Sequence, residues 1–232
     1  EPYRRQRQMC IRDSIMGVMM AVVATSRTFD MKQLGADAKG IKPCTKLINQ
    51  TIEKAASEGG GTIYFPAGTY LTATIHMKSN ITLHLESGAI VRFSDRFEDY
   101  LPFVTARWEG TVMQTLSPLI YAHSADNLTI TGRGTLDGNG LKWWLWEFET
   151  RKVIKENGGK LPSLDKLQQM WVDANKDLEI SDYYKPSLER KMFRPPFIQF
   201  YECTNILIEN VKIINSPFWT VLSLIHISEP TR

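Results

Sequence analysis

One short run of the chain combines three side chains that could bind a sugar acid. Arg107 offers two parallel N–H groups that match a carboxylate, Trp108 offers a flat ring for a sugar to stack on, and Glu109 offers a hydrogen-bond acceptor. The same run could also be an ion pair beside a buried tryptophan, which requires no ligand. We therefore treat all three as candidate substrate-binding residues, with structural packing as the open alternative.

Two further groups of aromatic residues could extend such a site. Trp143, Trp144 and Trp146 fall within four residues, so they cannot all face one way on a helix or a strand, and at least one is expected to pack in the core. We keep Trp143 and Trp144 as candidates for substrate binding. Phe218 and Trp219 follow a predicted turn and are candidates of the same kind, again with core packing as the alternative.

The titratable residues show no spacing typical of a metal site. Asp137 lies in the segment LDGNG, where a turn aspartate is the simpler interpretation. Asp95, Glu98 and Asp99 cluster after a predicted strand; a calcium site there would indicate a lyase, whereas a solvated acidic loop needs no ion. We expect the loop, and we expect neither a metal nor another cofactor.

The elements that must position these candidates are short strands separated by turn residues. A pattern of asparagine, an apolar residue and then alternating β-formers recurs at Asn80, Asn127 and Asn205. Asparagine suits the corners of such a repeat because its side chain bonds local backbone and tolerates left-handed dihedral angles. The other predicted strands near the start of the chain are residues 62–65, 69–75 and 89–93.

This recurrence predicts an all-β fold, a parallel β-helix in which each coil lays a strand beside the previous one. A β-sandwich is the alternative, but the strands lack two-residue hairpin turns. Residues 46–56 are predicted to form a capping helix that begins after Thr45 as N-cap and ends at the glycines 59–61. Residues 141–192 break the strand pattern and are predicted to be a helical insertion at one edge of the solenoid.

Within this insertion, a helix is expected to begin at Pro162 and Ser163. Its predicted apolar face consists of Leu164, Leu167, Met170, Trp171 and Ala174.

Both ends of the chain are expected to be foreign to the fold. Residues 9–14 (MCIRDS) and 222–232 (LSLIHISEPTR) resemble translated sequencing-adapter DNA, so residues 1–14 and 222–232 are interpreted as an artefactual leader and tail. Residues 15–27 are interpreted as the remnant of a signal peptide, because the apolar run at 16–24 is too short to span a bilayer. We expect a secreted or periplasmic protein with no membrane span.

Composition gives no reason to expect a nucleic-acid partner. The chain carries 28 Lys and Arg against 25 Asp and Glu, a net charge of +3. The first fourteen residues alone hold four arginines and two carboxylates, so about +1 remains for residues 15–221. We expect Cys44 and Cys203 to remain free thiols, with a disulfide between them as the alternative.

Several motifs together resemble the polygalacturonase-like, pectin-degrading family 28 of glycoside hydrolases. Residues 58–70 (EGGGTIYFPAGTY) are the least specific, since other β-helix families share them. The narrower motifs are residues 107–110 (RWEG), 117–121 (SPLIY), 132–138 (GRGTLDG), 194–197 (RPPF) and 215–220 (NSPFWT).

The resemblance implies a right-handed parallel β-helix that hydrolyses galacturonan or a related pectic polysaccharide with inversion. The family places its catalytic aspartates in Asn-Thr-Asp and Asp-Asp motifs after the Asn-Ser-Pro-Phe-Trp strand, and neither motif occurs in this chain. We therefore assign no catalytic residue. Residues 28–221 are expected to be the N-terminal coils of an incomplete hydrolase domain, inactive by themselves and monomeric when full length. A polysaccharide lyase and a non-catalytic glycan-binding β-helix remain the alternatives.

Overall fold

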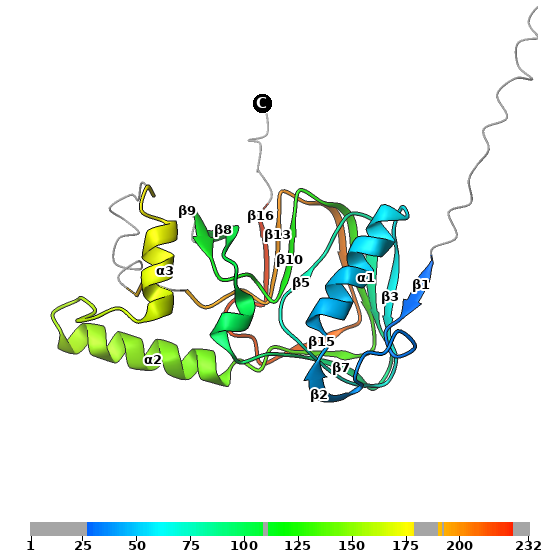
Figure 1. Ribbon diagram of the computed structural model, residues 1–232, viewed down its shortest axis with the longest axis horizontal. Helices are drawn as coiled ribbons and strands as arrows, with labels where there is room; N and C mark the ends of the chain where they lie inside the picture. Colours follow the sequence, from blue (N-terminus) through cyan, green and yellow to red (C-terminus); the bar gives the residue numbers. More distant parts are fainter. Residues whose placement is uncertain (1–26, 109–110, 179–189, 192, 225–232) are drawn as a thin grey trace, which may run out of the picture.

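The chain winds into coils whose strands stack in three parallel sheets (Figure 1). The computed structural model describes residues 27–108, 111–178, 190–191 and 193–224. The expected leader 1–14, nearly all of the expected signal remnant 15–27 and residues 225–232 of the expected tail lie outside the described residues. Residues 222–224, the start of the expected tail, are described and pair with residues 199–201 in a parallel sheet. In the part that is described, no helix is long and apolar enough to cross a membrane.

Sheets A and B take one strand from each successive coil, and sheet C takes one from each coil after the first; every pairing within the three sheets is parallel. Sheet A contains β1 (Thr28–Asp30), β3 (Gly61–Phe65), β6 (Ile81–Leu85), β11 (Asp126–Gly132) and β14 (Thr204–Ile208). Sheet B contains β2 (Lys39–Pro43), β4 (Gly68–Thr72), β7 (Ala89–Phe93), β12 (Thr135–Asp137) and β15 (Lys212–Ile214). Sheet C contains β5 (Ile75–His76), β10 (Ile120–His123), β13 (Ile198–Tyr201) and β16 (Val221–Leu224). The predicted right-handed parallel β-helix is confirmed, and the sandwich alternative is excluded.

Stacked apolar residues form the core of the solenoid. In sheet A, Ile63 aligns with Leu83, Leu83 with Ile130, and Ile130 with Ile208. Because side chains alternate across each strand, the residues on either side of each of these, within its own strand, face outward. Each aliphatic side chain buried in this way stabilises the fold by roughly 1.5–3 kcal/mol.

The recurring asparagines lie at one corner of the coils, as predicted. Asn80, Asn127 and Asn205 have positive φ angles of 62°, 59° and 50°. The side chain of Asn127 donates to the side-chain oxygen of Asn80 at 3.0 Å, and Asn205 donates to Asp126 at 2.7 Å. The same side chain therefore tolerates the turn and bonds one coil to the next.

Helix α1 (Thr45–Ser57) follows β2 and lies over one open end of the solenoid (Figure 1). Ile48 and Ile52 are fully buried, so the predicted capping helix is confirmed. The predicted N-cap is wrong, because Thr45 is already helical and Cys44 precedes it without a side-chain cap. The Thr45 hydroxyl instead accepts a hydrogen bond from the backbone N–H of Ala73 at 2.7 Å, which ties the helix to the first coil.

The large additions to the coils all arise between a strand of sheet B and the next strand of sheet C. The connection after β7 contains the short 3-10 helix η1 (Phe97–Tyr100) and the strands β8 (Val104–Trp108) and β9 (Thr111–Thr115). The connection after β12 contains α2 (Leu141–Glu156) and α3 (Lys166–Ala174). Because these connections leave at the same corner, the β8–β9 pair and both helices lie together outside sheet C (Figure 1).

Three local predictions are corrected by these elements. The strand expected over residues 69–75 is two strands, β4 and β5, because Ala73 and Thr74 turn the corner between sheets B and C. The β8–β9 pair is antiparallel, so the solenoid does carry one hairpin-like pair. Helix α3 begins at Lys166 rather than Pro162, since Asp165 and Gln168 form a capping box.

The predicted apolar face of α3 is only partly correct. Trp171 is buried and Leu167 packs against the core, whereas Leu164 precedes the helix and is partly exposed. Met170 points away from the core and is also partly exposed. Helix α3 therefore packs through a narrower stripe than its sequence predicts.

Candidate functional site

The candidate site lies where the additions gather against the outer face of sheet C. The hydroxyl of Tyr121, in β10, donates to the backbone oxygen of Thr105 at 2.6 Å. The side chain of Gln199, in β13, donates to the backbone oxygen of Arg107 at 3.0 Å. Burial raises the pKa of Tyr121 to about 12, so the phenol remains a donor at neutral pH. These two bonds hold the β8 strand, and with it Trp108, over the sheet.

Trp108 is a buried packing residue in this structure. Its ring lies 4.3 Å from the ring of Phe193, and its centroid is 6.5 Å from those of Phe218 and Trp219. Arg107, next in the strand, is only partly buried. Glu109, the third member of the expected group, lies outside the described residues. Trp108 is therefore the buried centre of an aromatic cluster that it forms with Phe193, Phe218 and Trp219.

Phe218 and Trp219 form the open end of this aromatic cluster. Their rings stack at 4.3 Å with an interplanar angle of 28°. Trp219 keeps 36% of its surface exposed, so part of its ring can meet a ligand. The guanidinium of Arg194 lies 4.9 Å from the Phe218 ring centroid, within the range of a cation–π contact. The open part of the Trp219 ring offers a flat apolar face on which a sugar can stack, while the Arg194 guanidinium on its flank is itself held by the protein.

The three clustered tryptophans do not all face one way, as expected: Trp143 and Trp146 both contact Phe97, whereas Trp144 reaches a different segment. Trp143 has no exposed surface and stacks on Phe97 at 4.1 Å, with Tyr100 at 5.6 Å. A ring without an exposed face cannot bind a sugar, so we withdraw Trp143 from the candidate binding residues. Trp144 is partly buried, and its indole N–H donates to the backbone oxygen of Ser216 at 2.9 Å. Trp144 therefore holds the chain segment that leads to Trp219.

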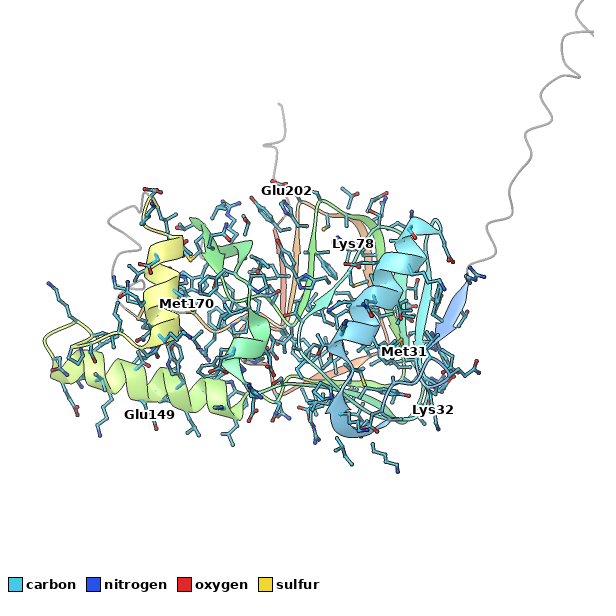
Figure 2. The ribbon with its side chains drawn as sticks, viewed as in Figure 1. Met31, Lys32, Lys78, Glu149, Met170 and Glu202 are labelled. Carbon is cyan, nitrogen blue, oxygen red and sulfur yellow. The ribbon has the colours of Figure 1, made fainter. Side chains whose placement is uncertain are left out.

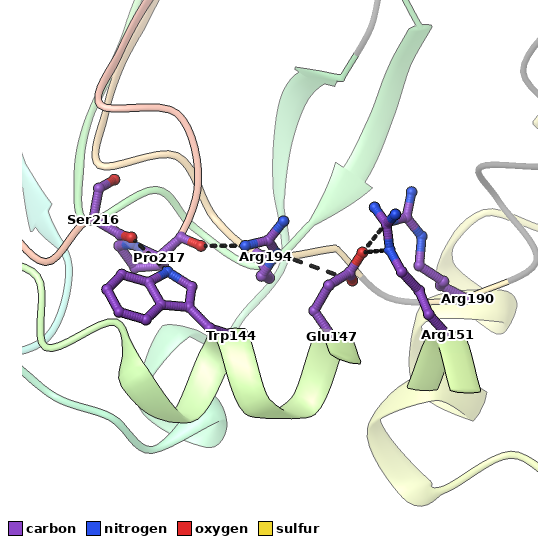
Figure 3. A network of polar contacts seen from close by, with 7 residues as sticks. All are labelled: Trp144, Glu147, Arg151, Arg190, Arg194, Ser216 and Pro217. Carbon is purple, nitrogen blue, oxygen red and sulfur yellow. Dashed lines mark hydrogen bonds and ion pairs between the residues drawn. The ribbon is translucent and has the colours of Figure 1, made fainter. Parts of the chain in front are cut away.

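A buried carboxylate lies among three arginines next to this cluster (Figure 3). Glu147, in α2, bonds to Arg151 at 2.6 Å, contacts Arg190 closely, and lies 4.0 Å from Arg194. Burial alone would raise the pKa of Glu147, but the hydrogen bonds and charges of Arg151 and Arg190 hold it below its usual value. The sequence reasoning missed Glu147 and Arg190. Glu147 and Arg151 are four residues apart on a predicted helix, and this spacing could have indicated an ion pair that involves Glu147.

Asp137 forms a second polar cluster, at the end of β12. Its carboxylate accepts hydrogen bonds from the side chain of Asn215 at 2.8 Å, the backbone N–H of Asn139 at 3.1 Å and the guanidinium of Arg92 at 3.1 Å. Asn139 and Asn215 both have positive φ angles, so Asp137 stabilises two turns at once. The predicted turn aspartate is confirmed.

The Asp137 cluster predicts how stability depends on pH. Burial would raise the pKa of Asp137, but its three donors outweigh burial and lower it. A lowered pKa in the folded state means that the stabilisation is complete above about pH 4 and is lost as the pH falls further. We expect Asp137→Asn to lower the free energy of unfolding at pH 7 and to have a smaller effect at pH 3, measured by urea denaturation. An effect that is as large at pH 3 as at pH 7 would contradict this.

The remaining titratable candidates have structural surroundings. Asp99 accepts a hydrogen bond from Ser94 at 2.6 Å and lies 3.8 Å from Arg96. Among the described residues, no group of three or more His, Cys, Asp or Glu side chains could hold a metal ion. Cys44 and Cys203 are buried free thiols, so the disulfide alternative is excluded.

Comparison with known proteins identifies relatives for most of the described coils. The family described as rhamnogalacturonase A/epimerase, pectate lyase-like, matches residues 28–143. The chain is 27% identical over 176 residues to a probable polygalacturonase of Vitis vinifera, a match that covers 73% of the chain and 28% of the relative. It is 29% identical over 132 residues to an exo-poly-alpha-D-galacturonosidase of Dickeya chrysanthemi, covering 54% of the chain and 22% of the relative.

Solved structures agree with these relatives. The chain is 35% identical to a hyperthermoactive exopolygalacturonase of Thermotoga maritima, with a TM-score of 0.63, and the match covers 83% of the chain and 43% of that structure. A family 28 exopolygalacturonase of Yersinia enterocolitica, at 20% identity and a TM-score of 0.62, shares the fold over 86% of the chain and 37% of its own length. The chain thus spans about a quarter of these curated relatives and less than half of these two structures.

Proposed function

Because the chain belongs to the rhamnogalacturonase A/epimerase, pectate lyase-like family, and its motifs are those of polygalacturonase-like family 28 hydrolases, we propose that the whole protein is a pectic glycoside hydrolase. Its substrate class is galacturonan or a related pectic polysaccharide, in polymer or oligogalacturonide form. The observation that carries this proposal is the 35% identity to the Thermotoga maritima exopolygalacturonase over 83% of the chain, on the same stacked coils.

The proposed chemistry is hydrolysis with inversion at the anomeric carbon. One carboxylic acid would protonate the leaving oxygen, while a carboxylate roughly 6.5–9.5 Å away would activate a water on the opposite face of the sugar. We assign neither role to a residue of this chain, because the family's Asn-Thr-Asp and Asp-Asp motifs do not occur in it, and the carboxylates of the two described clusters are engaged by protein groups. Glu147 is bound to arginines and Asp137 to turn donors.

Within the chain we propose that the open aromatic end of the cluster binds sugar. Trp219 and Phe218 supply the accessible rings. Arg107 stays a candidate through its motif alone, because successive side chains of a strand point to opposite faces and Arg107 is the neighbour of Trp108 in β8. Trp108 and Trp144 support this surface from beneath, by ring packing and by the bond to Ser216. An acidic sugar is proposed from the relatives and the family motifs, because the arginines that border the rings are already held by Glu147.

The whole protein should release new reducing ends from polygalacturonic acid, and these products should be saturated. Nuclear magnetic resonance of the first-formed sugar should show the anomeric configuration opposite to that of the substrate bond. Products that absorb in the ultraviolet because of a new double bond would select a polysaccharide lyase instead. Retention of the polymer on the protein without new reducing ends would select a non-catalytic glycan-binding β-helix.

Trp219→Ala should weaken substrate binding by about fivefold to tenfold in the whole protein, because it removes the most accessible ring of the cluster. The change should appear mainly in KM for an oligogalacturonide, with kcat altered less. The matched control is Phe148→Ala, which removes an exposed ring of α2 that lies in neither described cluster. Equal KM values for the two variants would remove Trp219 from the proposed binding surface.

We also propose that the protein is exported, either secreted or periplasmic, and acts as a monomer. Its proposed polymeric substrate is found outside cells, and residues 16–24 have the length of a signal-peptide core, although they lie outside the described residues. Cell fractionation of the source organism, with the protein recovered only from the cytoplasm, would contradict export.

A further inference from the structure

The guanidinium of Arg194 is engaged on three sides by protein. One nitrogen donates to the backbone oxygen of Pro217 at 2.9 Å, the plane lies over the ring of Phe218, and the edge faces Glu147 at 4.0 Å. Its side chain is only 18% exposed. Arg194 therefore has little capacity left for a substrate carboxylate, although it belongs to one of the narrower family motifs, residues 194–197.

The carboxylate of Glu147 partly balances the positive charge of the three arginines around it. Arg151 is largely exposed and solvated, whereas the Arg190 side chain is 13% exposed. Removing two guanidiniums from water is costly unless an anion lies next to them, and Glu147, itself 5% exposed, is the carboxylate that contacts both. Neutralising Glu147 would leave both partly buried cations without this partner.

Helix α2 directs two residues of one face at the same loop. Trp144 and Glu147 are three residues apart and so lie on neighbouring positions of that face. Trp144 binds the backbone of Ser216 directly, while Glu147 acts on Pro217 through Arg194 (Figure 3). The loop fixed by these contacts carries the stacked rings of Phe218 and Trp219.

We propose that Glu147 is a positioning residue, which holds Arg194 and thereby orders the loop at residues 216–219 so that the Trp219 face is available to substrate. This inference rests on the proposed function for its kinetic consequence only. Its structural consequence, the ordering of Trp219, does not require that function. The helical insertion thus has a role in the proposed binding surface, because α2 holds the loop that carries Trp219.

The test compares Glu147→Gln with Glu149→Gln in the whole protein. Both changes remove one carboxylate from α2, but Glu149 lies on the outer, exposed side of the helix (Figure 2). Fluorine-labelled tryptophan allows the ring of Trp219 to be followed by nuclear magnetic resonance, with Trp219→Phe to assign its signal. The buried ring of Trp143 in the same sample reports whether the fold is intact.

We expect Glu147→Gln to shift or broaden the Trp219 signal and leave the Trp143 signal in place, while Glu149→Gln changes neither. We expect KM for an oligogalacturonide to rise about fivefold or more, with kcat reduced less. Arg194→Lys, which keeps the charge but loses the planar contact with Phe218, should have the same effect, and the double variant should add little to either single change.

Two results would overturn the proposal. An unchanged Trp219 signal in Glu147→Gln would mean that the carboxylate does not order the loop. A simultaneous loss of the native Trp143 signal would mean that Glu147 holds the fold in general. If the protein lacks activity on galacturonan, the proposed function fails, while the resonance comparison still decides the positioning role.

Discussion

Replacing Gly132 with alanine should lower the free energy of unfolding by about 3–5 kcal/mol. Gly132 ends β11 with φ at +116°, and a Cβ built on it would lie 2.0 Å from the backbone oxygen of Leu85. That oxygen cannot move freely, because it accepts hydrogen bonds from the backbone N–H groups of Arg133 at 2.8 Å and Gly134 at 3.1 Å. The substitution therefore combines an unfavourable dihedral angle with a clash against fixed backbone.

Gly159→Ala is the control that has the unfavourable dihedral angle without the clash. Gly159 also has a positive φ, at +92°, but a Cβ added to it would meet no described atom within 4 Å. It should lose only the dihedral cost, about 1 kcal/mol. Urea denaturation of both variants measures the difference, and equal losses would show that the coil relaxes around the added methyl group.

Trp143→Ala is expected to have the second-largest effect, a loss of about 3–5 kcal/mol in the free energy of unfolding. The ring is fully buried and joins α2 to η1 through its contacts with Phe97 and Tyr100. Its indole N–H has no hydrogen-bond partner among the described residues. Trp143→Phe should therefore cost much less than Trp143→Ala, because it keeps most of the buried ring and removes no hydrogen bond.

Phe148→Ala is the control on the same helix. Phe148 is 70% exposed, so its removal should change stability by no more than about 0.5 kcal/mol. Thermal or chemical denaturation compares the three variants. A small effect of Trp143→Ala would mean that α2 contributes little to the core, and would also weaken the argument that α2 supports the loop before β16.

Local chemistry accounts for the parts of the fold that the sequence predicted well. Strand β7 has the predicted bounds, and β6 begins directly after Asn80 as its repeat predicts, because alternating apolar residues and flanking turn residues act over a few positions only. The corner role of Asn80, Asn127 and Asn205 follows from a property of the asparagine side chain itself. Thr45 is the counterexample: its hydroxyl was available for a cap, but a backbone N–H 28 residues away competes for it.

The candidate site was predictable only as a set of residue types. The motifs pointed to Arg107, Trp108, Phe218 and Trp219 but could not say which rings would remain open. Whether a ring is open depends on which segment covers it, and here Phe193 from the end of the insertion covers Trp108. No local pattern contains that information, because the two residues come from different coils.

Residue types and their spacing along the chain were enough to predict the repeating coil, its asparagine corners, the capping helix and the family. Each depends on side chains within one strand, one turn or one helix, where spacing specifies geometry. The packing of distant segments determines that Trp143 is buried in the core, that Trp219 is exposed, and that Glu147 pairs with Arg190 and Arg194. Those partners lie 43 and 47 positions away, and the path of the insertion between them decides whether they meet.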